Sequence, residues 1–204
     1  MNNKVELIGV YGGDYLHALS AWTSTKRELT EDREKRIKEF LKQLADNEHH
    51  TPFEKSAIHF LVTTDLASHV HLIKHRINVS VNSESSRYQE QKDKWYVPTD
   101  WPEEEKKELE DFIELSHQKY HNCIKSLVSK GFTRSRAKES ARYYLPYAKQ
   151  LTQDVMFNFR SFMHFQKLRN SEHAQLEIRQ IAQEMLQLVR ETHQFDLSLE
   201  SFGF

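Results

Sequence analysis

The chain has 204 residues, a formal net charge of -1 and one cysteine, Cys123. This length suits one domain, residues 1–204, with a real core, and the near-zero charge gives no global basic field for a nucleic-acid backbone, so we expect no nucleic-acid partner. One cysteine excludes an intrachain disulfide framework, and no apolar run reaches the roughly 20 residues that cross a bilayer; we therefore expect a soluble, cytoplasmic protein without a membrane partner.

The N-terminal part of the chain predicts a short strand followed by helices. Apolar residues within 5–10 predict the strand, and the two glycines at 12 and 13 predict a plain turn, since a Gly-Gly pair is weak evidence for phosphate binding. A helical turn is expected over residues 16–22. Thr30 can cap a further helix whose apolar residues recur at three-to-four spacing up to Leu44.

The middle of the chain predicts a second strand and a long helix. Residues 56–63 alternate in a way that favours a strand largely covered on both faces, and a helix over 66–74 leads into a polar cluster at 74–88. An aromatic loop follows at 95–98. A long amphipathic helix is then expected from about Pro102 until Gly131 ends it.

The last third of the chain predicts three more helices. Thr133 caps a short one that contains Ala141 and Tyr144. Another is expected over about 152–167, with a stripe of phenylalanines that we interpret as core or subunit contact. The last covers about 172–192 and buries an aliphatic stripe.

The polar cluster at 74–88 suggests a binding site. Its fifteen residues include two arginines, one lysine, one histidine, four serines and two asparagines. Arginine forks match phosphate and carboxylate groups, and hydroxyls with backbone N–H groups complete an anion cradle. The composition indicates phosphate-ester or nucleotide binding, and a solvated loop is the alternative.

Two adjacent histidines, His49 and His50, raise the question of a metal site. Helical ligand pairs usually stand four residues apart, and no carboxylate or cysteine set accompanies this pair. We therefore expect no bound metal.

A set of motifs along the chain resembles one enzyme family. The order His-Arg, then Ser-x-Asn-x-x-Ser-x-Arg-Tyr, is present at His75, Arg76, Ser80, Asn82, Ser85, Arg87 and Tyr88. It resembles the signature of the flavin-dependent thymidylate synthases, and the segments 49–54, 141–146 and 158–179 fit the same family in order. The resemblance implies the α+β fold of that family, an antiparallel sheet packed with several long helices.

The resemblance also implies the reaction. The family methylates dUMP at uracil C5 to give dTMP, with methylenetetrahydrofolate as carbon donor and NADPH-reduced FAD as hydride source. No strand-linked Gly-x-Gly-x-x-Gly indicates a Rossmann site, so FAD would bind in the family's own way, at subunit interfaces of a homotetramer.

Site residues follow from the same resemblance, position by position. The implied nucleotide site contains His71, Ser83, Glu84, Ser85, Ser86, Arg87, Arg142 and Arg169. The implied flavin and folate site contains Ser24, His49, Thr51, Glu54, Lys74, His75, Arg76, Asn158, Arg160, His164, Leu168 and His173. Arg169 would be catalytic, because it would stabilise charge on the uracil ring as C5 attacks. For Ser85 we favour a binding role over a nucleophilic one, because no base is fixed beside it by the sequence.

The signature departs from the family pattern in four places. Lys74 replaces an arginine, His71 replaces a glutamine, and Ser83 stands where a glutamate is usual, with Glu84 next. Three residues rather than two separate Arg76 from Ser80, which in a helix would turn the basic triplet by about 100° relative to the serines.

These departures keep other functions open. One alternative is flavin-dependent addition of a methyl or hydroxymethyl group to another pyrimidine nucleotide, and loss of activity is conceivable. A second is a non-catalytic nucleotide- or RNA-binding module that uses the basic cluster and the nearby aromatic residues.

Overall fold

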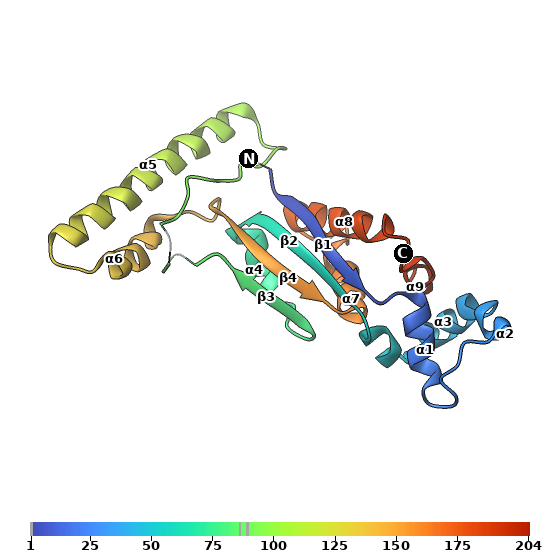
Figure 1. Ribbon diagram of the computed structural model, residues 1–204. Coiled ribbons are helices and arrows are strands. Elements are labelled where there is room, and N and C mark those ends of the chain that lie inside the picture. The colour runs from blue at the N-terminus through green and yellow to red at the C-terminus, as the bar shows by residue number, and fades with distance from the viewer. Residues whose placement is uncertain (1, 86, 89) are drawn as a thin grey trace. The chain divides into compact units, whose positions relative to one another are not determined.

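The computed structural model describes residues 2–85, 87, 88 and 90–204, and its chain divides into two compact units (Figure 1). We call Met1–Lys4, Thr63–His71 and Ser83–Gln153 the helical unit. Val5–Val62, Leu72–Asn82 and Asp154–Phe204 form the sheet unit. That both belong to one domain stays a prediction.

Four strands form one sheet in the order β1-β2-β4-β3. Their bounds are Lys4–Tyr11 for β1, Ala57–Asp65 for β2, Val79–Ser83 for β3 and Gln150–Phe157 for β4. The N–H of Glu84 donates to the carbonyl of Thr152 at 3.0 Å, beside one end of the β3–β4 pair. At the other end the N–H of Asn158 donates to the carbonyl of Asn78 at 3.4 Å. Residue numbers rise on one strand as they fall on its neighbour, so this pair is antiparallel, and the α+β fold with an antiparallel sheet is confirmed.

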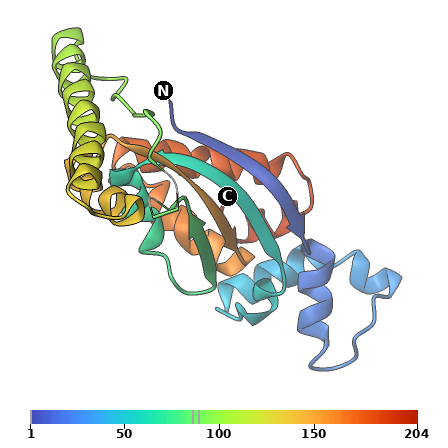
Figure 2. The same ribbon diagram turned by 60° about the vertical axis from the view of Figure 1, so that its left-hand side comes forward.

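Helices cover one face of the sheet in the sheet unit (Figures 1 and 2). Ile58, Phe60 and Val62 alternate along β2, and each is fully buried against the same core as α7 (Phe159–Arg169) and α8 (Leu176–Arg190). The β2 residues between them are only half-buried, so one face of this strand is fully covered rather than both as predicted.

The sheet unit also contains shorter helices, several of which pack on one another. They are α1 (Asp14–Trp22), α2 (Glu31–Glu34), α3 (Ile37–Asp46), the 3-10 helix η1 (Thr51–Glu54) and α9 (Asp196–Ser201). Thr30 caps α2, because its side chain accepts the N–H of Arg33 at 3.3 Å. Gly12 has a φ of 104° in the turn after β1, and a Cβ there would lie 2.7 Å from the Cβ of Ser56, so this turn requires glycine.

In the helical unit, α5 (Glu103–Ser129) packs on α6 (Arg134–Ala141) and on the 3-10 helix η2 (Arg142–Tyr144). Their small core contains Tyr120, Ile124, Ala137 and Ala141. The predicted cap is present, since Thr133 accepts the N–H of Arg136 at 3.3 Å. Among the described residues, no helix has the length and apolar character needed to cross a membrane.

The helix predicted over residues 152–167 is wrong in its first part, because residues 150–157 form strand β4. Val155 and Phe157 are buried while Asp154 and Met156 are exposed, which is the alternation of a strand with one covered face. α7 begins only after Asn158, whose side-chain oxygen accepts the N–H of Ser161 at 2.8 Å. The phenylalanines therefore belong to two different elements that share one core.

The polar cluster lies on a turn and a strand. Helix α4 (Leu66–Ile73) ends before Lys74, Asn78 has a φ of 53°, and β3 follows. The helical rotation expected from the extra residue does not arise, because the positions between Arg76 and Ser80 are not helical. The turn is held by the hydroxyl of Ser161, which donates to the carbonyl of Ile77 at 2.8 Å.

Candidate functional site

A cavity of about 1190 Å³ lies within the sheet unit. It is formed by α7, the turn at 74–79, the end of α3 with the residues after it, and residues 201–204. Seven of the predicted site residues line it: Lys74, His75, Arg76, Arg160, His164, Leu168 and Arg169. The volume exceeds the roughly 300 to 1000 Å³ of common ligand pockets, so the cavity can take a large ligand.

The spacing of α7 explains why its polar side chains reach the cavity. Arg160, His164 and Leu168 are four residues apart, and residues at this spacing share one face of a helix. Phe162 and Phe165 point to the other side and are fully buried in the core. One face of α7 thus packs in the core, and another face lines the cavity.

The cavity is rich in positive charge. Six of its lining residues are cationic and two are acidic; they are Lys42, Lys74, Arg76, Arg160, Lys167 and Arg169 against Asp46 and Glu48. Apolar side chains, among them Met163, Leu168 and Phe202, complete the lining. This combination fits a ligand that carries both phosphate groups and an apolar planar ring.

His75 and Arg169 form the buried polar contact of the cavity. The Nε–H of Arg169 donates to Nε2 of His75 at 3.0 Å, and His75 is only 8% exposed. An imidazole nitrogen that accepts a bond carries no proton, so His75 is neutral with its proton on Nδ1. Burial, then the charge of Arg169 and the neighbouring His164, lowers the pKa of His75 to about 4. The arginine is therefore held by a neutral imidazole at neutral pH.

Two other predicted residues, Glu54 and Asn158, form contacts at the start of α7. Arg160 donates from Nη1 to the carboxylate of Glu54 at 2.5 Å, which links α7 to η1. Asn158 caps α7 through its bond to Ser161 and so fixes where the helix begins. By fixing the start of the helix, Asn158 helps to position Arg160 and His164, two and six residues further on.

Four predicted cofactor residues lie elsewhere. Ser24 follows α1 and donates to the carbonyl of Ala21 at 3.0 Å. His49 follows α3, Thr51 begins η1 and His173 precedes α8. None of these four is among the described residues that line the cavity, and their roles stay predictions.

The predicted nucleotide segment follows β3 in the helical unit. Glu84 is held against β4, because its carboxylate accepts the N–H of Thr152 at 3.2 Å. The hydroxyl of Ser85 accepts the N–H of Arg87 at 3.2 Å, which makes a local turn. Ser83 ends β3, whereas Ser86 lies outside the described residues.

Helix α6 and the 3-10 helix η2 contribute charged residues near this segment. Nε of Arg87 donates to Glu139 on α6 at 2.6 Å, and Arg142 begins η2 directly after α6. His71 is placed on α4 of the same unit. Arg169 belongs to the sheet unit, and its convergence with Arg87 and Arg142 on one ligand stays a prediction.

Sequence reasoning missed several residues that line the cavity. Lys167 could have been found, since it lies three residues after His164 on the same helix. His50 was considered only as a metal ligand. Residues 201–204 carried no signal, because they lie beyond the recognised motifs. Within the described ranges, no group of three or more His, Cys, Asp or Glu side chains is arranged to hold a metal ion.

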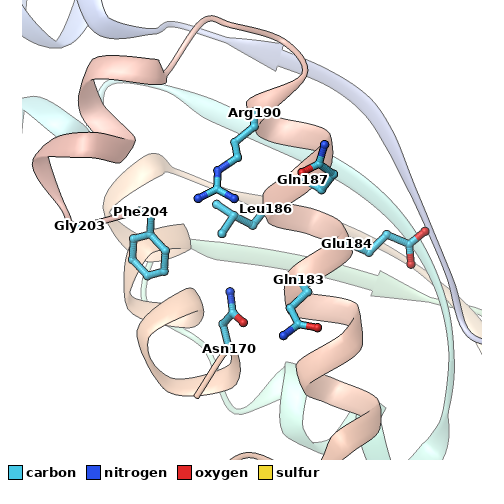
Figure 3. Close-up of a pocket in the computed structure, with 8 residues that line it drawn as sticks. All are labelled: Asn170, Gln183, Glu184, Leu186, Gln187, Arg190, Gly203 and Phe204. Carbon is cyan, nitrogen blue, oxygen red and sulfur yellow. The ribbon is translucent and has the colours of Figure 1, made fainter. Parts of the chain in front are cut away.

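A second, smaller cavity of about 610 Å³ lies between α8 and residues 203–204 (Figure 3). Amide and charged side chains surround it, namely Asn170, Gln183, Glu184, Gln187 and Arg190, together with Leu186, Gly203 and Phe204. The described residues that line it include none of the predicted site residues.

Comparison with known proteins gives one family. The family model described as "Thymidylate synthase complementing protein" matches residues 6–193. Flavin-dependent thymidylate synthases are similar to the chain: that of Kosmotoga olearia is 29% identical over 87% of this chain and 81% of its own length. The one from Thermosipho melanesiensis is 30% identical over 92% of this chain and 85% of its own length.

A solved structure supports the fold. The UMP/dUMP methylase PolB from Streptomyces cacaoi, bound with 5-Br dUMP, superposes with a TM-score of 0.82. It is 24% identical, and the match covers 99% of this chain and 95% of that one. At this identity the likeness shows the fold, and it agrees with the fold that the sequence motifs imply.

Proposed function

The chain belongs to the flavin-dependent thymidylate synthase family, an enzyme family of methyltransferases, and from this premise we propose that it methylates dUMP at uracil C5 to give dTMP. In this proposal methylenetetrahydrofolate donates the carbon and NADPH is the reductant. The active enzyme is a homotetramer with its sites at subunit interfaces.

The cavity of the sheet unit is the FAD site in this proposal. No side chain can donate a hydride, and bound FAD supplies that chemistry. FAD carries two phosphates and an apolar ring system, which fit the cationic and apolar parts of the lining. Lys74, Arg76 and Arg160 hold the phosphates, and Met163 and Leu168 offer apolar surface.

Arg169 acts on the nucleotide. Its guanidinium stays charged at any working pH, so it can stabilise negative charge that develops on the uracil ring as C5 attacks the carbon donor. The bond to His75 fixes the Nε edge of the arginine and thereby limits the directions in which its other N–H groups point.

Arg87 and Arg142 hold the phosphate of dUMP, with Ser85 as a hydroxyl partner. Arg87 is paired with Glu139 in the structure, so a phosphate must share this guanidinium with the carboxylate or displace it. Two arginines provide forked donors that match a phosphate dianion. Arg87 lies four residues after the end of β3, and Arg142 begins η2 directly after α6.

The observation that carries the proposal is the cation-rich cavity that gathers seven predicted residues around the contact between His75 and Arg169. A visible absorption spectrum of the purified protein tests it. We expect a flavin band that NADPH bleaches in the presence of dUMP. A colourless protein that takes up no added FAD would contradict the proposal, and salt-dependent binding to polynucleotide without flavin would favour an RNA-binding module instead.

A further inference from the structure

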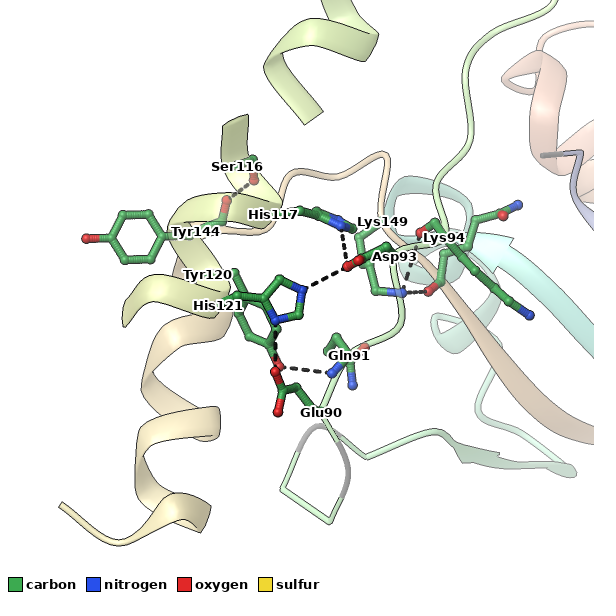
Figure 4. Close-up of polar contacts among 11 residues, drawn as sticks. Glu90, Gln91, Asp93, Lys94, Ser116, His117, Tyr120, His121, Tyr144 and Lys149 are labelled. Carbon is green, nitrogen blue, oxygen red and sulfur yellow. Dashed lines mark hydrogen bonds and ion pairs between the residues drawn. The ribbon is translucent and has the colours of Figure 1, made fainter. Parts of the chain in front are cut away.

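The segment Glu90–Lys94 of the helical unit is bound to α5 by a cluster of histidines and carboxylates (Figure 4). His117 and His121 lie four residues apart on α5 and face this segment. Asp93 Oδ1 lies 2.8 Å from Nδ1 of His117 and 3.0 Å from Nε2 of His121. Glu90 Oε1 lies 2.8 Å from Nδ1 of His121.

The geometry at His121 fixes its protonation state. Each of its two ring nitrogens faces a carboxylate oxygen, and a carboxylate can only accept. Both nitrogens must therefore donate, which only the imidazolium can do. A neutral His121 would leave one carboxylate, Asp93 or Glu90, facing a nitrogen lone pair.

His117 behaves differently, although it lies one turn away. Its Nδ1 bonds Asp93, but its Nε2 is buried with no hydrogen-bond partner in the described structure. Burial lowers the pKa of His117 against the opposing effect of Asp93, so this ring is neutral and donates from Nδ1. Of the two histidines, His121 is therefore the one that carries a positive charge.

Other groups hold the same segment from three elements. Arg134 of α6 donates to Glu90 at 2.6 Å, and the hydroxyl of Tyr120 on α5 accepts the N–H of Gln91 at 2.9 Å. Lys149, which precedes β4, donates to the carbonyl of Lys94 at 3.5 Å. Among all the side chains that hold this segment, only those of His117 and His121 belong to a residue type with an ordinary pKa near neutrality.

The segment is continuous with the predicted nucleotide site. Arg87 lies three residues before Glu90 in the sequence. The next residue, Tyr88, is held by α6, since Lys138 donates to the carbonyl of Tyr88 at 3.0 Å. We propose that His121, as an imidazolium, is a positioning residue that clamps Glu90–Lys94 onto α5, and that its deprotonation loosens this segment and weakens nucleotide binding at Ser85 and Arg87. The effect on nucleotide binding rests on the proposed function.

The direction of the pH effect follows from the contacts. Burial acts to lower the pKa of His121, but its hydrogen bonds to Asp93 and Glu90 outweigh this and raise it above the ordinary value of 6.5. The clamp is therefore complete below about pH 6.5 and is lost as the pH rises through the raised pKa. Between the pKa of His121 in the open state and its higher pKa in the closed state, opening becomes about tenfold more favourable for each pH unit.

Amide hydrogen exchange of the peptide that contains Gln91 tests the clamp, because the N–H of Gln91 is bonded to Tyr120. His121→Arg keeps two donor edges without titrating near neutrality, and the side chain of His121 is 31% exposed, which leaves room for the larger group. His121→Gln removes the charge. His193→Gln is the matched control, since His193 also pairs with a carboxylate, Asp196 at 3.1 Å, but in the sheet unit.

We expect the ratio of exchange in the wild-type protein to exchange in His121→Arg to rise between pH 6 and pH 9, by a factor of about ten for each unit by which the pKa of His121 in the closed state exceeds that in the open state. Taking the ratio at each pH removes the intrinsic pH dependence of exchange. His121→Gln should exchange fast at every pH, and the His193 control should follow the wild type. A flat ratio, or equally protected His121→Gln, would overturn the clamp. Should His121→Arg fail to fold, His121→Lys takes its place.

Binding of dUMP, measured on the same variants, tests the link to the nucleotide. The wild-type dissociation constant should rise with pH in step with exchange, and that of His121→Arg should stay level. Equal pH dependence in both proteins would overturn the link. If Arg87→Ala binds dUMP normally, the proposed nucleotide site is wrong, while the exchange data still decide the clamp.

Discussion

The contact between His75 and Arg169 allows a specific test of how the active site is organised. His75→Ala removes the acceptor for the Nε–H of Arg169, a bond of 3.0 Å to a residue that is 8% exposed. A hydrogen bond to a charged group is worth about 1.5 to 3 kcal/mol. At 1.36 kcal/mol per factor of ten, turnover should fall by roughly ten- to 150-fold if the bond positions the arginine for the transition state.

The assay is kcat for dTMP formation at saturating FAD and dUMP, so that weaker cofactor binding does not mimic a loss of turnover. His75→Gln is the matched variant, because its amide oxygen can replace the imidazole acceptor, and it should lose much less activity than His75→Ala.

A double-mutant cycle with Arg169→Lys separates positioning from other roles of His75. Lysine has no Nε–H edge, so in this background His75→Ala should cost little further activity. If His75→Ala loses the same factor in both backgrounds, the two residues act independently and the reasoning is refuted.

Three further predictions follow from single contacts. Arg169→Ala should leave flavin bound, as read from the visible spectrum, but should lose about 2 to 4 kcal/mol of transition-state stabilisation and so turn over much more slowly. Methylation at the normal rate would contradict a catalytic role for Arg169. Asn158→Ala should lower the unfolding free energy by about 1 kcal/mol in urea titration through loss of the α7 cap, and an unchanged midpoint would argue against the cap. Burial lowers the pKa of His17 to about 4, so the unfolding free energy should fall by up to about 3 kcal/mol as the pH drops from 6.5 towards 4. His17→Gln should flatten this dependence in chemical denaturation, and an unaltered slope would assign the effect to other groups.

The surroundings of His17 explain why its protonation should lower the stability of the fold. Its Nδ1 lies 2.9 Å from the hydroxyl of Ser198 and its Nε2 lies 3.0 Å from that of Ser56, and the ring is fully buried. Ser56 in turn accepts the N–H of Phe159 at the start of α7 at 3.2 Å. A proton on both nitrogens of His17 would place a charge in this closed environment.

Local pattern was enough to predict most helices and the first two strands. The long helix α5 follows from its apolar spacing between Pro102 and Gly131, and α6 follows from the cap at Thr133. In these segments local preference and the burial pattern agree, so the tertiary structure does not override either.

The main error lies in residues 152–167, where the same run of apolar residues is compatible with the alternation of a strand and with the spacing of a helix. Val155 and Phe157 alternate on a strand, and Phe162 and Phe165 follow on a helix, but all four enter one core. In the sequence they form a single apolar run that resembles a helical stripe. Asn158 could have marked the start of the helix, because asparagine is a common N-cap residue, but the family motif indicated a binding role for it instead.

The motifs named seven residues that line one cavity, but they did not indicate how these residues contact one another. The motifs identified His75 and Arg169, but only the structure reveals that one holds the other. The pairing of Arg87 with Glu139 joins residues 52 positions apart, which no local pattern encodes. Residues 201–204 line the cavity because α9 brings them there, and that short helix was not predicted.

The product formed from dUMP tests the central claim most directly. The purified protein is incubated with FAD, NADPH, methylenetetrahydrofolate and dUMP, and the nucleotide mass is measured, with UMP as a parallel substrate. We predict that dUMP gains one methyl group and becomes dTMP. Unmodified dUMP from a protein with bound, reducible flavin would contradict the claim, and a hydroxymethyl product or methylation of UMP alone would assign the same fold to a different reaction.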